Sequence, residues 1–212
     1  MMRTSVLPAA ILRRSLLTGA AITATLVLSA CGGDTSSSSS GGHDGMAPSG
    51  TPASAVTFND ADVTFAQMMI VHHQQAVEMA ELAESRAADA EVKTLAGTIK
   101  AAQDPEIATM TGWLTTWGKP TTAPDGGGHG SSHASMPGMM SDADMTKLKA
   151  AKGAAFDKQF VTMMIAHHEG AITMSEEEIA KGSNTEAKAL AQQIVTAQEA
   201  EIDTMNKITA RL

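Results

Sequence analysis

The chain has 212 residues, of which 43% are hydrophobic and 18% are charged, and this fits one globular domain of ordinary size with appended segments. Aromatic residues make up only 3% and Tyr is absent, whereas 15 residues are Met, so the chain lacks the usual filling of a β-sandwich or barrel and is expected to be helical. A net charge of −8 argues against nucleic-acid binding, and a single Cys excludes an intramolecular disulfide, a thiolate zinc site and an iron–sulfur cluster.

Residues 1–30 have the features of an export signal. Arg3, Arg13 and Arg14 precede an uncharged apolar stretch at 15–30. This stretch is short for a membrane span and ends in Leu-Ser-Ala before Cys31. This ending resembles the bacterial lipobox, in which the Cys is lipidated and becomes the first residue of the mature protein. We therefore predict a lipoprotein signal peptide at 1–30 and a lipid-membrane anchor at Cys31, which place the mature chain outside the cytoplasm on the cell membrane or envelope. The sequence leaves open whether general secretion or twin-arginine export is used.

Two further stretches have the composition of linkers. Residues 31–57 are rich in Gly, Ser, Pro and Thr and bury too little apolar surface to fold, so they are predicted to be a disordered tether. Residues 119–140 have a similar composition with added His and Met. They are predicted to be a loop that separates two helical regions.

The remaining chain is an internal duplication with a shift of 95 residues. Residues 65–73 read Phe-Ala-Gln-Met-Met-Ile-Val-His-His, and residues 160–168 read Phe-Val-Thr-Met-Met-Ile-Ala-His-His. The match continues without a gap, and it includes the polar pairs Asp62/Asp157, Gln103/Gln198 and Glu106/Glu201. Identity between the copies thus extends to polar residues, which need a reason beyond core packing.

Each copy has the periodicity of two helices. The expected buried face of the first copy carries Phe65, Met69, His72, Ala76 and Met79 on one helix and Leu95, Ile99, Ala102 and Glu106 on the next. Asp89 and Asn184 stand where the N-caps of the second helices belong. A hairpin alone buries little, so we predict that repeat 1 (about 58–118) and repeat 2 (about 141–212) pack as an all-α four-helix bundle over 58–212. In repeat 2 the first helix is expected to begin near Ser141, with a weak point at Gly153.

Two Met/His pairs in each copy carry a metal-binding hypothesis. A spacing of four residues places both side chains of a pair on one side of a helix, as in Met68/His72, Met69/His73, Met163/His167 and Met164/His168. Thioether sulfur is a soft, neutral ligand, so Met combined with imidazole selects copper, above all Cu(I). The alternative is that the Met residues are flexible core filler.

Polar residues on the second helices have two interpretations. Glu106 and Glu201 are expected to accept hydrogen bonds from the imidazoles and so orient the metal ligands, with Gln103 and Gln198 supporting them from one turn away. Alternatively, each Glu pairs with a His in a buried polar network without a metal. The loop is open to two interpretations as well, a solvated linker or a low-affinity copper-capture segment that uses His129, His133, Met136, Met139 and Met140.

The doubled Met-Met-Ile-x-His-His motif, with Ala-x-x-Met downstream and Gln-x-x-Glu-Ile-x-x-Met on the second helix, resembles the bacterial family known as domain of unknown function 305. The resemblance covers nearly all of 58–212. It implies an exported, ferritin-like four-helix bundle and copper binding, as in a cyanobacterial member of the family. It also implies that the copper ligands include Met79 and Met174 beside the four Met/His pairs.

The preferred function is an envelope-anchored copper-binding protein that sequesters or delivers Cu(I) without chemistry of its own, with another copper-handling envelope protein as a partner. A ferritin-like di-metal oxidoreductase is the enzyme alternative, but neither copy has the Glu-x-x-His motif of such sites. Non-covalent haem binding by Met and His is a third hypothesis, and a structural bundle without a ligand is a fourth. The sequence does not decide whether the two repeats hold separate metal sites or share one.

Overall fold

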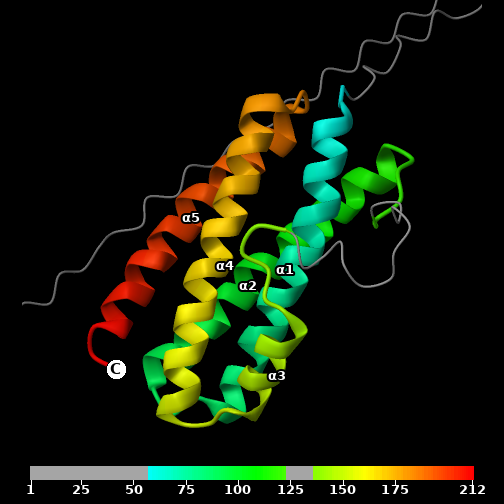
Figure 1. The fold of residues 1–212 in the computed structure, drawn as a ribbon. Helices are drawn as coiled ribbons and strands as arrows, with labels where there is room; N and C mark the ends of the chain where they lie inside the picture. The colour runs from blue at the N-terminus through cyan, green and yellow to red at the C-terminus, as the bar shows by residue number, and fades with distance from the viewer. Residues whose placement is uncertain (1–56, 123–135) are drawn as a thin grey trace, which may run out of the picture. The chain divides into compact units, whose positions relative to one another are not determined.

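The computed structural model describes residues 57–122 and 136–212, which form five helices and no strand (Figure 1). Helices α1 (Asp60–Arg86) and α2 (Ala90–Thr116) form one hairpin, and α4 (Ala154–Lys181) and α5 (Thr185–Thr209) form the other. The short helix α3 (Asp142–Ala150) precedes the second hairpin. The predicted all-α architecture of two paired hairpins is confirmed, with α3 as an addition.

The two hairpins meet mainly through α1 and α4, which run antiparallel. At one end, the Asn59 side-chain amide donates to the Lys181 carbonyl at 2.9 Å. At the other end, the Gly153 amide donates to the Arg86 carbonyl at 2.8 Å. The middle of α1 therefore lies beside the middle of α4, where the repeated His-His motifs are located.

The helix ends follow from local capping. The Asn59 side chain accepts hydrogen bonds from the backbone amides of Ala61 and Asp62, while Asp62 accepts one from the Asn59 amide, which completes a capping box at the start of α1. Asp89 and Asn184 cap α2 and α5 as predicted. Pro105 lies within α2, which continues through it.

Two details differ from the sequence-based expectation. Ala102 is exposed and Gln103 is buried in its place, because the buried face of α2 advances by four residues from Leu95 to Ile99 to Gln103. The segment from Ser141 is two separate helices, and they are divided at the predicted weak point, Gly153, which has a φ of +62° that favours glycine.

Asp62 and Asp157, an identical pair in the duplication, cap the turn of the opposite hairpin. Asp62 accepts hydrogen bonds from the amides of Ser183 (3.1 Å) and Asn184 (2.9 Å), at the start of α5. Asp157 accepts them from the amides of Ala88 (3.1 Å) and Asp89 (3.1 Å), at the start of α2. Each hairpin thus closes the turn of the other, and these reciprocal caps explain why both carboxylates survive.

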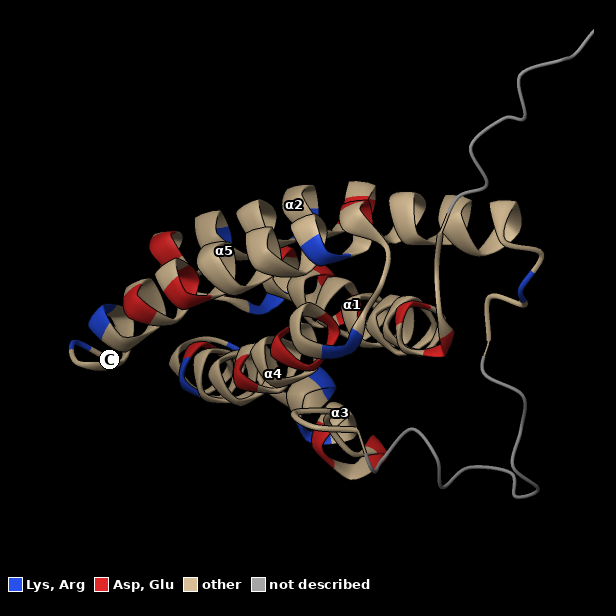
Figure 2. Cartoon of the chain, turned by 90° about the horizontal axis from the view of Figure 1, so that it is seen from above, with Lys and Arg blue, Asp and Glu red and all other residues tan. Residues whose placement is uncertain are grey.

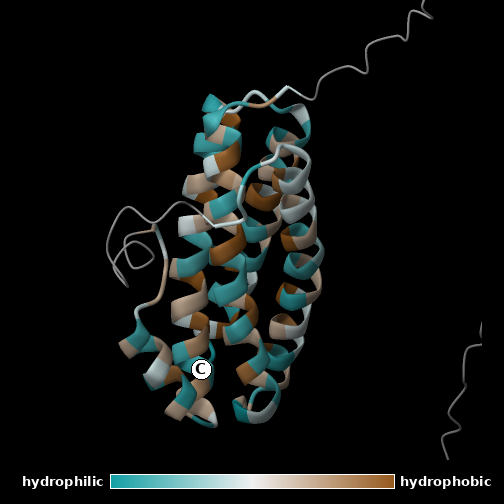
Figure 3. Ribbon diagram, turned by 90° about the vertical axis from the view of Figure 1, so that its right-hand side faces the viewer, coloured by the Kyte–Doolittle hydropathy of each residue, from teal (hydrophilic) through white to brown (hydrophobic). Residues whose placement is uncertain are grey.

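The interior consists of two apolar clusters with a polar layer between them. One cluster contains residues from the end of α1, the start of α2 and the start of α4, together with Met145 and Leu148 of α3. The other contains residues from the start of α1, the end of α2 and the middle of α4. Figure 3 shows hydrophobic and hydrophilic segments alternating along the helices, as expected for helices that each bury one face. This packing holds the polar side chains of the middle layer at fixed positions inside the bundle.

Candidate metal centre

The middle of the bundle contains a polar layer of eight side chains, four from each repeat. They are His72, His73, Gln103, Glu106, His167, His168, Gln198 and Glu201. All four histidines are 0% exposed. Burying so many polar groups costs free energy unless they are paired, so their partners decide what the layer can do.

His72 and His167 meet at the centre of the layer. Their ring centroids are 3.7 Å apart, with an angle of 37° between the ring planes. The Nε2–H of His72 donates to the Pro137 carbonyl at 3.0 Å. The Nδ1 atom of His72 and both ring nitrogens of His167 have no hydrogen-bond partner among the described residues. Three of the four ring nitrogens in this pair are therefore buried without a partner.

His73 and His168 face away from this centre, each toward the second helix of its own hairpin. The distance from His73 Nε2 to Glu106 Oε2 is 2.7 Å, and that from His168 Nε2 to Glu201 Oε2 is also 2.7 Å. The two copies are thus identical in geometry as well as in sequence. Glu106 and Glu201 hold the second histidine of each motif and leave the first histidine of each motif to its counterpart.

Gln103 and Gln198 are buried in the same layer with unused hydrogen-bonding groups. Both side-chain polar atoms of Gln103, and the side-chain oxygen of Gln198, lack a partner within residues 57–122 and 136–212. An amide that keeps a free donor or acceptor inside the protein adds to the polarity of the layer. These residues lie where the sequence predicts support for the histidines, but they do not bond to the rings.

The predicted thioether ligands are distributed on both sides of the His72–His167 pair. Met68 and Met174 line a pocket between α1 and α4, on the side of the start of α1. Met79 and Met163 are buried in the apolar cluster on the opposite side. Met69 is in the same apolar cluster as Met174, and Met164 is in the same cluster as Met79 and Met163. Both Met69 and Met164 are 0% exposed. Sulfur atoms therefore flank the imidazoles on both sides, as the antiparallel duplication requires.

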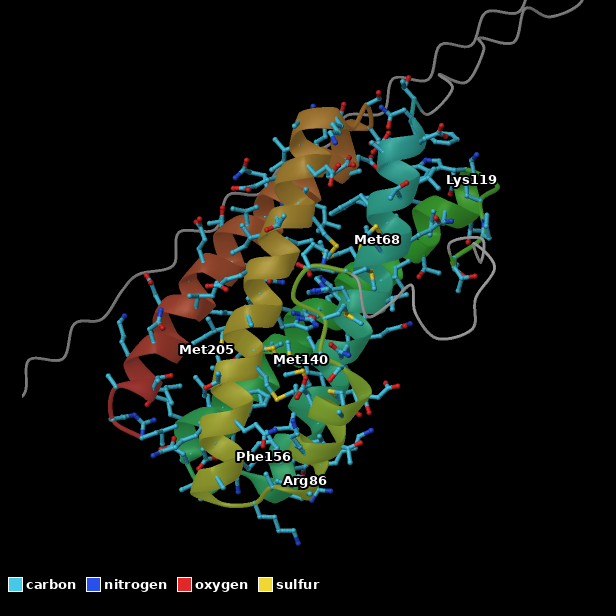
Figure 4. All side chains as sticks on the ribbon, in the orientation of Figure 1. Met68, Arg86, Lys119, Met140, Phe156 and Met205 are labelled. Atoms are coloured by element: carbon cyan, nitrogen blue, oxygen red, sulfur yellow. The ribbon has the colours of Figure 1, made fainter. Side chains whose placement is uncertain are left out.

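Residues 136–140, called the strap below, cross the groove between α1 and α4 over the histidine pair. The Gln75 side chain donates to the Met140 carbonyl (2.9 Å) and accepts from the Met140 amide (2.7 Å). Gly138 has a φ of +74° and lies so close to Gly170 of α4 that a Cβ on Gly170 would be 2.1 Å from the Pro137 carbonyl oxygen. The side chains of Met68 and Met140 are labelled in Figure 4.

The strap corrects one sequence-based interpretation and adds residues that the sequence did not single out. A solvated linker is wrong for residues 136–140, because Met136 is only 8% exposed and Met139 and Met140 are partly buried. His129 and His133 lie outside the described residues. Gln75 and Gly170 both contact the strap, and they occupy equivalent positions in the two repeats. The replacement of one residue by the other between the copies is the sequence signal that could have located the strap.

Electrostatics keep the central imidazoles neutral. Burial, followed by repulsion from His73, lowers the pKa of His72 to about 3, although the bond to Pro137 opposes the shift. Burial and then the neighbouring His72 lower the pKa of His167 well below its ordinary value. A neutral imidazole has one N–H group and one nitrogen with a free lone pair. Because the Nε2–H of His72 donates to Pro137, the free lone pair is on Nδ1, which has no partner among the described residues.

The donor set of the layer favours a soft metal ion. Within residues 57–122 and 136–212, no three His, Cys, Asp or Glu side chains are grouped closely enough to hold a metal ion. Thioether sulfur from the flanking methionines is available to an ion bound by His72 and His167. Imidazole with thioether, without a carboxylate group, is the combination that suits Cu(I) rather than zinc or magnesium.

Comparison with known proteins identifies the family. The family model described as domain of unknown function (DUF305) matches residues 62–209. The chain belongs to the DUF305 family. Among curated proteins, none matches this DUF305 chain.

Solved DUF305 structures have a similar fold. A protein from Streptomyces coelicolor, described as DUF305 and secreted, is 35% identical with a TM-score of 0.65, and the match covers 71% of this chain and 93% of that one. A DUF305 fragment from Deinococcus radiodurans is 33% identical with a TM-score of 0.66, covering 73% and 98%. CopM in its Cu(II)-bound form is 32% identical with a TM-score of 0.61, covering 71% and 96%. CopM is also known in Cu(I)-bound and Ag-bound forms.

These findings confirm the family and the fold expected from the sequence. They also record copper binding in one relative and secretion in the description of another. In the part of this DUF305 chain that the structure describes, no helix combines the length and the apolar character needed to cross a membrane.

Proposed function

We propose that this protein binds Cu(I) in its polar layer and sequesters or hands on copper outside the cytoplasm, without chemistry of its own. The observation that carries the proposal is the His72–His167 pair, two buried neutral rings in contact with each other. Three of their four ring nitrogens have no hydrogen-bond partner among the described residues. Each buried polar atom without a partner costs about 1–3 kcal/mol. A bound ion would remove that cost, which explains why both copies keep the pair.

The residues present fit a copper ion. His72 and His167 would provide imidazole nitrogen, and thioethers would come from the repeated methionines that flank them, Met68, Met69, Met79, Met163, Met164 and Met174. Glu106 and Glu201 would orient His73 and His168, which stay candidate ligands because their Nδ1 atoms have no partner among the described residues. The copper- and silver-bound forms of CopM support the same choice of metal, because Ag(I) is a mimic of Cu(I).

A competition titration against a coloured Cu(I) chelator tests the proposal. The His72→Ala/His167→Ala variant should lose nearly all tight Cu(I) binding, because it removes the nitrogens that converge. The His73→Ala/His168→Ala variant changes the neighbouring residue in each copy and tests whether the second histidines also bind. It should weaken binding less, because Glu106 and Glu201 hold those two rings away from the central pair. Unchanged copper uptake in a folded His72→Ala/His167→Ala variant would contradict the proposal.

The anchor is the second part of the proposed function. We propose that Cys31, which lies outside the described residues, carries lipid and holds the copper-binding bundle at the cell membrane, where another copper-handling envelope protein exchanges metal with it. Cys31→Ser should shift the protein from the membrane fraction to the soluble extracytoplasmic fraction. A Ser variant that still sediments with membranes after a high-salt wash would show that something else attaches it.

A further inference from the structure

The groove between α1 and α4 has an open section near the start of α1. It is a pocket of about 270 Å³, lined by Asp60, Ala61, Thr64, Phe65 and Met68 of α1 and by Met174, Glu177 and Glu178 of α4. Two thioethers, one from each hairpin, thus share a cavity with three carboxyl groups. Figure 2 shows acidic residues at the first turn of α1, where the pocket lies.

Glu178 is an unusual residue in this pocket. It is only 1% exposed, and neither of its carboxyl oxygens has a hydrogen-bond partner among the described residues. The neighbouring Glu177 is exposed and pairs with Lys181, and Asp60 is also exposed. A buried carboxyl group without a counter-ion is costly, and a cation in the pocket would compensate it.

The other repeat shows that the pocket is specific to one side of the bundle. Shifting by 95 residues, Met68 and Met174 correspond to Met163 and Met79, so the sulfur atoms are the same on both sides. The acidic positions differ, because Asp60, Glu177 and Glu178 correspond to Ala155, Leu82 and Ala83.

The equivalent space on that other side is filled. Phe156, which corresponds to Ala61, is 0% exposed there and packs with Met79, Met163 and Leu82 in an apolar cluster. Met145 and Leu148 of α3 belong to the same cluster. The repeats therefore share the thioethers and histidines but differ in access to them.

Two further parts of the groove are covered by described residues. The strap lies over the middle, against His72 and Gly170. Helix α3 contacts α1 and α4 on the far side of the strap. Since His72 and His167 are fully buried, an ion must pass between helices to reach them. The pocket at Met68 is one helical turn from His72.

We propose that this pocket, the α1–α4 port, is where a soft monovalent cation first binds on its way to the polar layer. Met68 and Met174 are its thioether ligands, Asp60 and Glu177 supply negative charge at its mouth, and Glu178 becomes the third carboxylate when the cation replaces its proton. The inference rests on the proposed copper function and adds to it a route of entry. A cleft lined with one sign of charge raises the association rate of an oppositely charged ligand by about 10-fold to 1000-fold, so the port acts on rate more than on capacity.

A quench-flow measurement with Ag⁺, a redox-inert probe, tests the port. Protein is mixed with Ag⁺, free ion is trapped by excess thiol after a set time, and the ions retained are counted by native mass spectrometry. The Asp60→Asn/Glu177→Gln/Glu178→Gln variant should take up Ag⁺ about tenfold more slowly, and the difference should shrink at high salt. The number of ions bound at equilibrium should be unchanged.

A matched control removes three carboxyl groups elsewhere. Glu84, Glu199 and Asp203 are exposed carboxylates on α1 and α5, and no ion pair involves them within the described residues. The Glu84→Gln/Glu199→Gln/Asp203→Asn variant should take up Ag⁺ within about twofold of the wild-type rate. Equal slowing in both triple variants would overturn the port. Absence of Ag⁺ binding by the wild-type protein would instead overturn the proposed function itself.

A second variant blocks the port without changing charge. Ala61→Phe places in the pocket the residue that fills the equivalent space at Phe156. It should slow Ag⁺ uptake at least as much as the acidic triple variant, while circular dichroism reports the same helix content. Uptake at the wild-type rate in a folded Ala61→Phe protein would also overturn the port.

Discussion

Glu178 and Asp62 are two carboxyl groups of the same region whose pKa values shift in opposite directions. Burial, and then the adjacent Asp62 carboxylate, raise the pKa of Glu178 to about 8. Burial alone would raise the pKa of Asp62, but hydrogen bonds from the amides of Asn184, Asn59 and Ser183 outweigh it and lower that pKa. Near neutral pH, Asp62 is therefore the ionised cap and Glu178 is largely protonated.

The raised pKa of Glu178 predicts a fall in stability as the pH rises. The folded protein keeps a proton that the unfolded chain loses above its ordinary pKa of 4.5, so the stabilisation is complete below that pH and is lost progressively up to about pH 8. Glu178→Gln, which cannot ionise, should match the wild type at pH 5 and exceed its free energy of unfolding at pH 9 by about 2–4 kcal/mol. Urea unfolding of metal-free protein at both pH values measures this. A difference that is the same at pH 5 and pH 9 would refute the prediction.

The reciprocal caps predict a large effect from a single carboxylate. Asp157→Ala removes the acceptor for the amides of Ala88 and Asp89, which leaves them without a partner beside the turn. We expect the free energy of unfolding to fall by about 1–3 kcal/mol. The control Asp203→Ala, on the exposed side of α5, should change it by less than about 0.5 kcal/mol. Similar losses in both variants, measured by urea unfolding, would mean that the cap contributes little.

At the scale of the elements, the strap depends on the close contact between Gly138 and Gly170. Gly170→Ala should destabilise the protein by about 1–3 kcal/mol, because its Cβ would overlap the Pro137 carbonyl. Hydrogen exchange of residues 136–140 should become faster, since displacing Pro137 also breaks its bond to His72.

Gly97→Ala is the control for that substitution. Gly97 is also inside a helix, α2, but nothing lies within 4 Å of the position of its Cβ. Replacing it by Ala should stabilise the protein by up to about 1 kcal/mol, because Ala has the higher helix propensity. A stability gain in Gly170→Ala, or unchanged exchange in the strap, would show that the strap does not pack on α4.

The helices and the strap differ in how well the sequence predicts them. Helices and caps were predictable because periodicity and capping are local, as at Asp89 and Asn184. The strap was not predictable, because composition describes only what a segment can bury by itself. Residues 136–140 are ordered by Gln75 and Gly170, which are distant in sequence.

At the scale of the molecule, the duplication predicted two equivalent hairpins but not their relative rotation. That rotation decides that His72 meets His167 while His73 and His168 face their own second helices. The identity of the polar pairs between the copies indicated that they matter. Only the packing of α1 on α4 shows which residues converge and which turn away.

The reciprocal caps have the geometry of an isologous dimer. Asp62 and Asp157 exchange equivalent bonds across an approximate twofold axis, as two identical subunits would. A free chain of one repeat could satisfy the same bonds by pairing with a second copy, so the present protein has the form of a fused homodimer. Residues 57–122 alone should therefore sediment as a helical dimer, and Asp62→Ala should shift that fragment toward monomer. Besides providing the strap, the linking segment would then make association independent of concentration, and it left each half free to diverge on its own side of the axis.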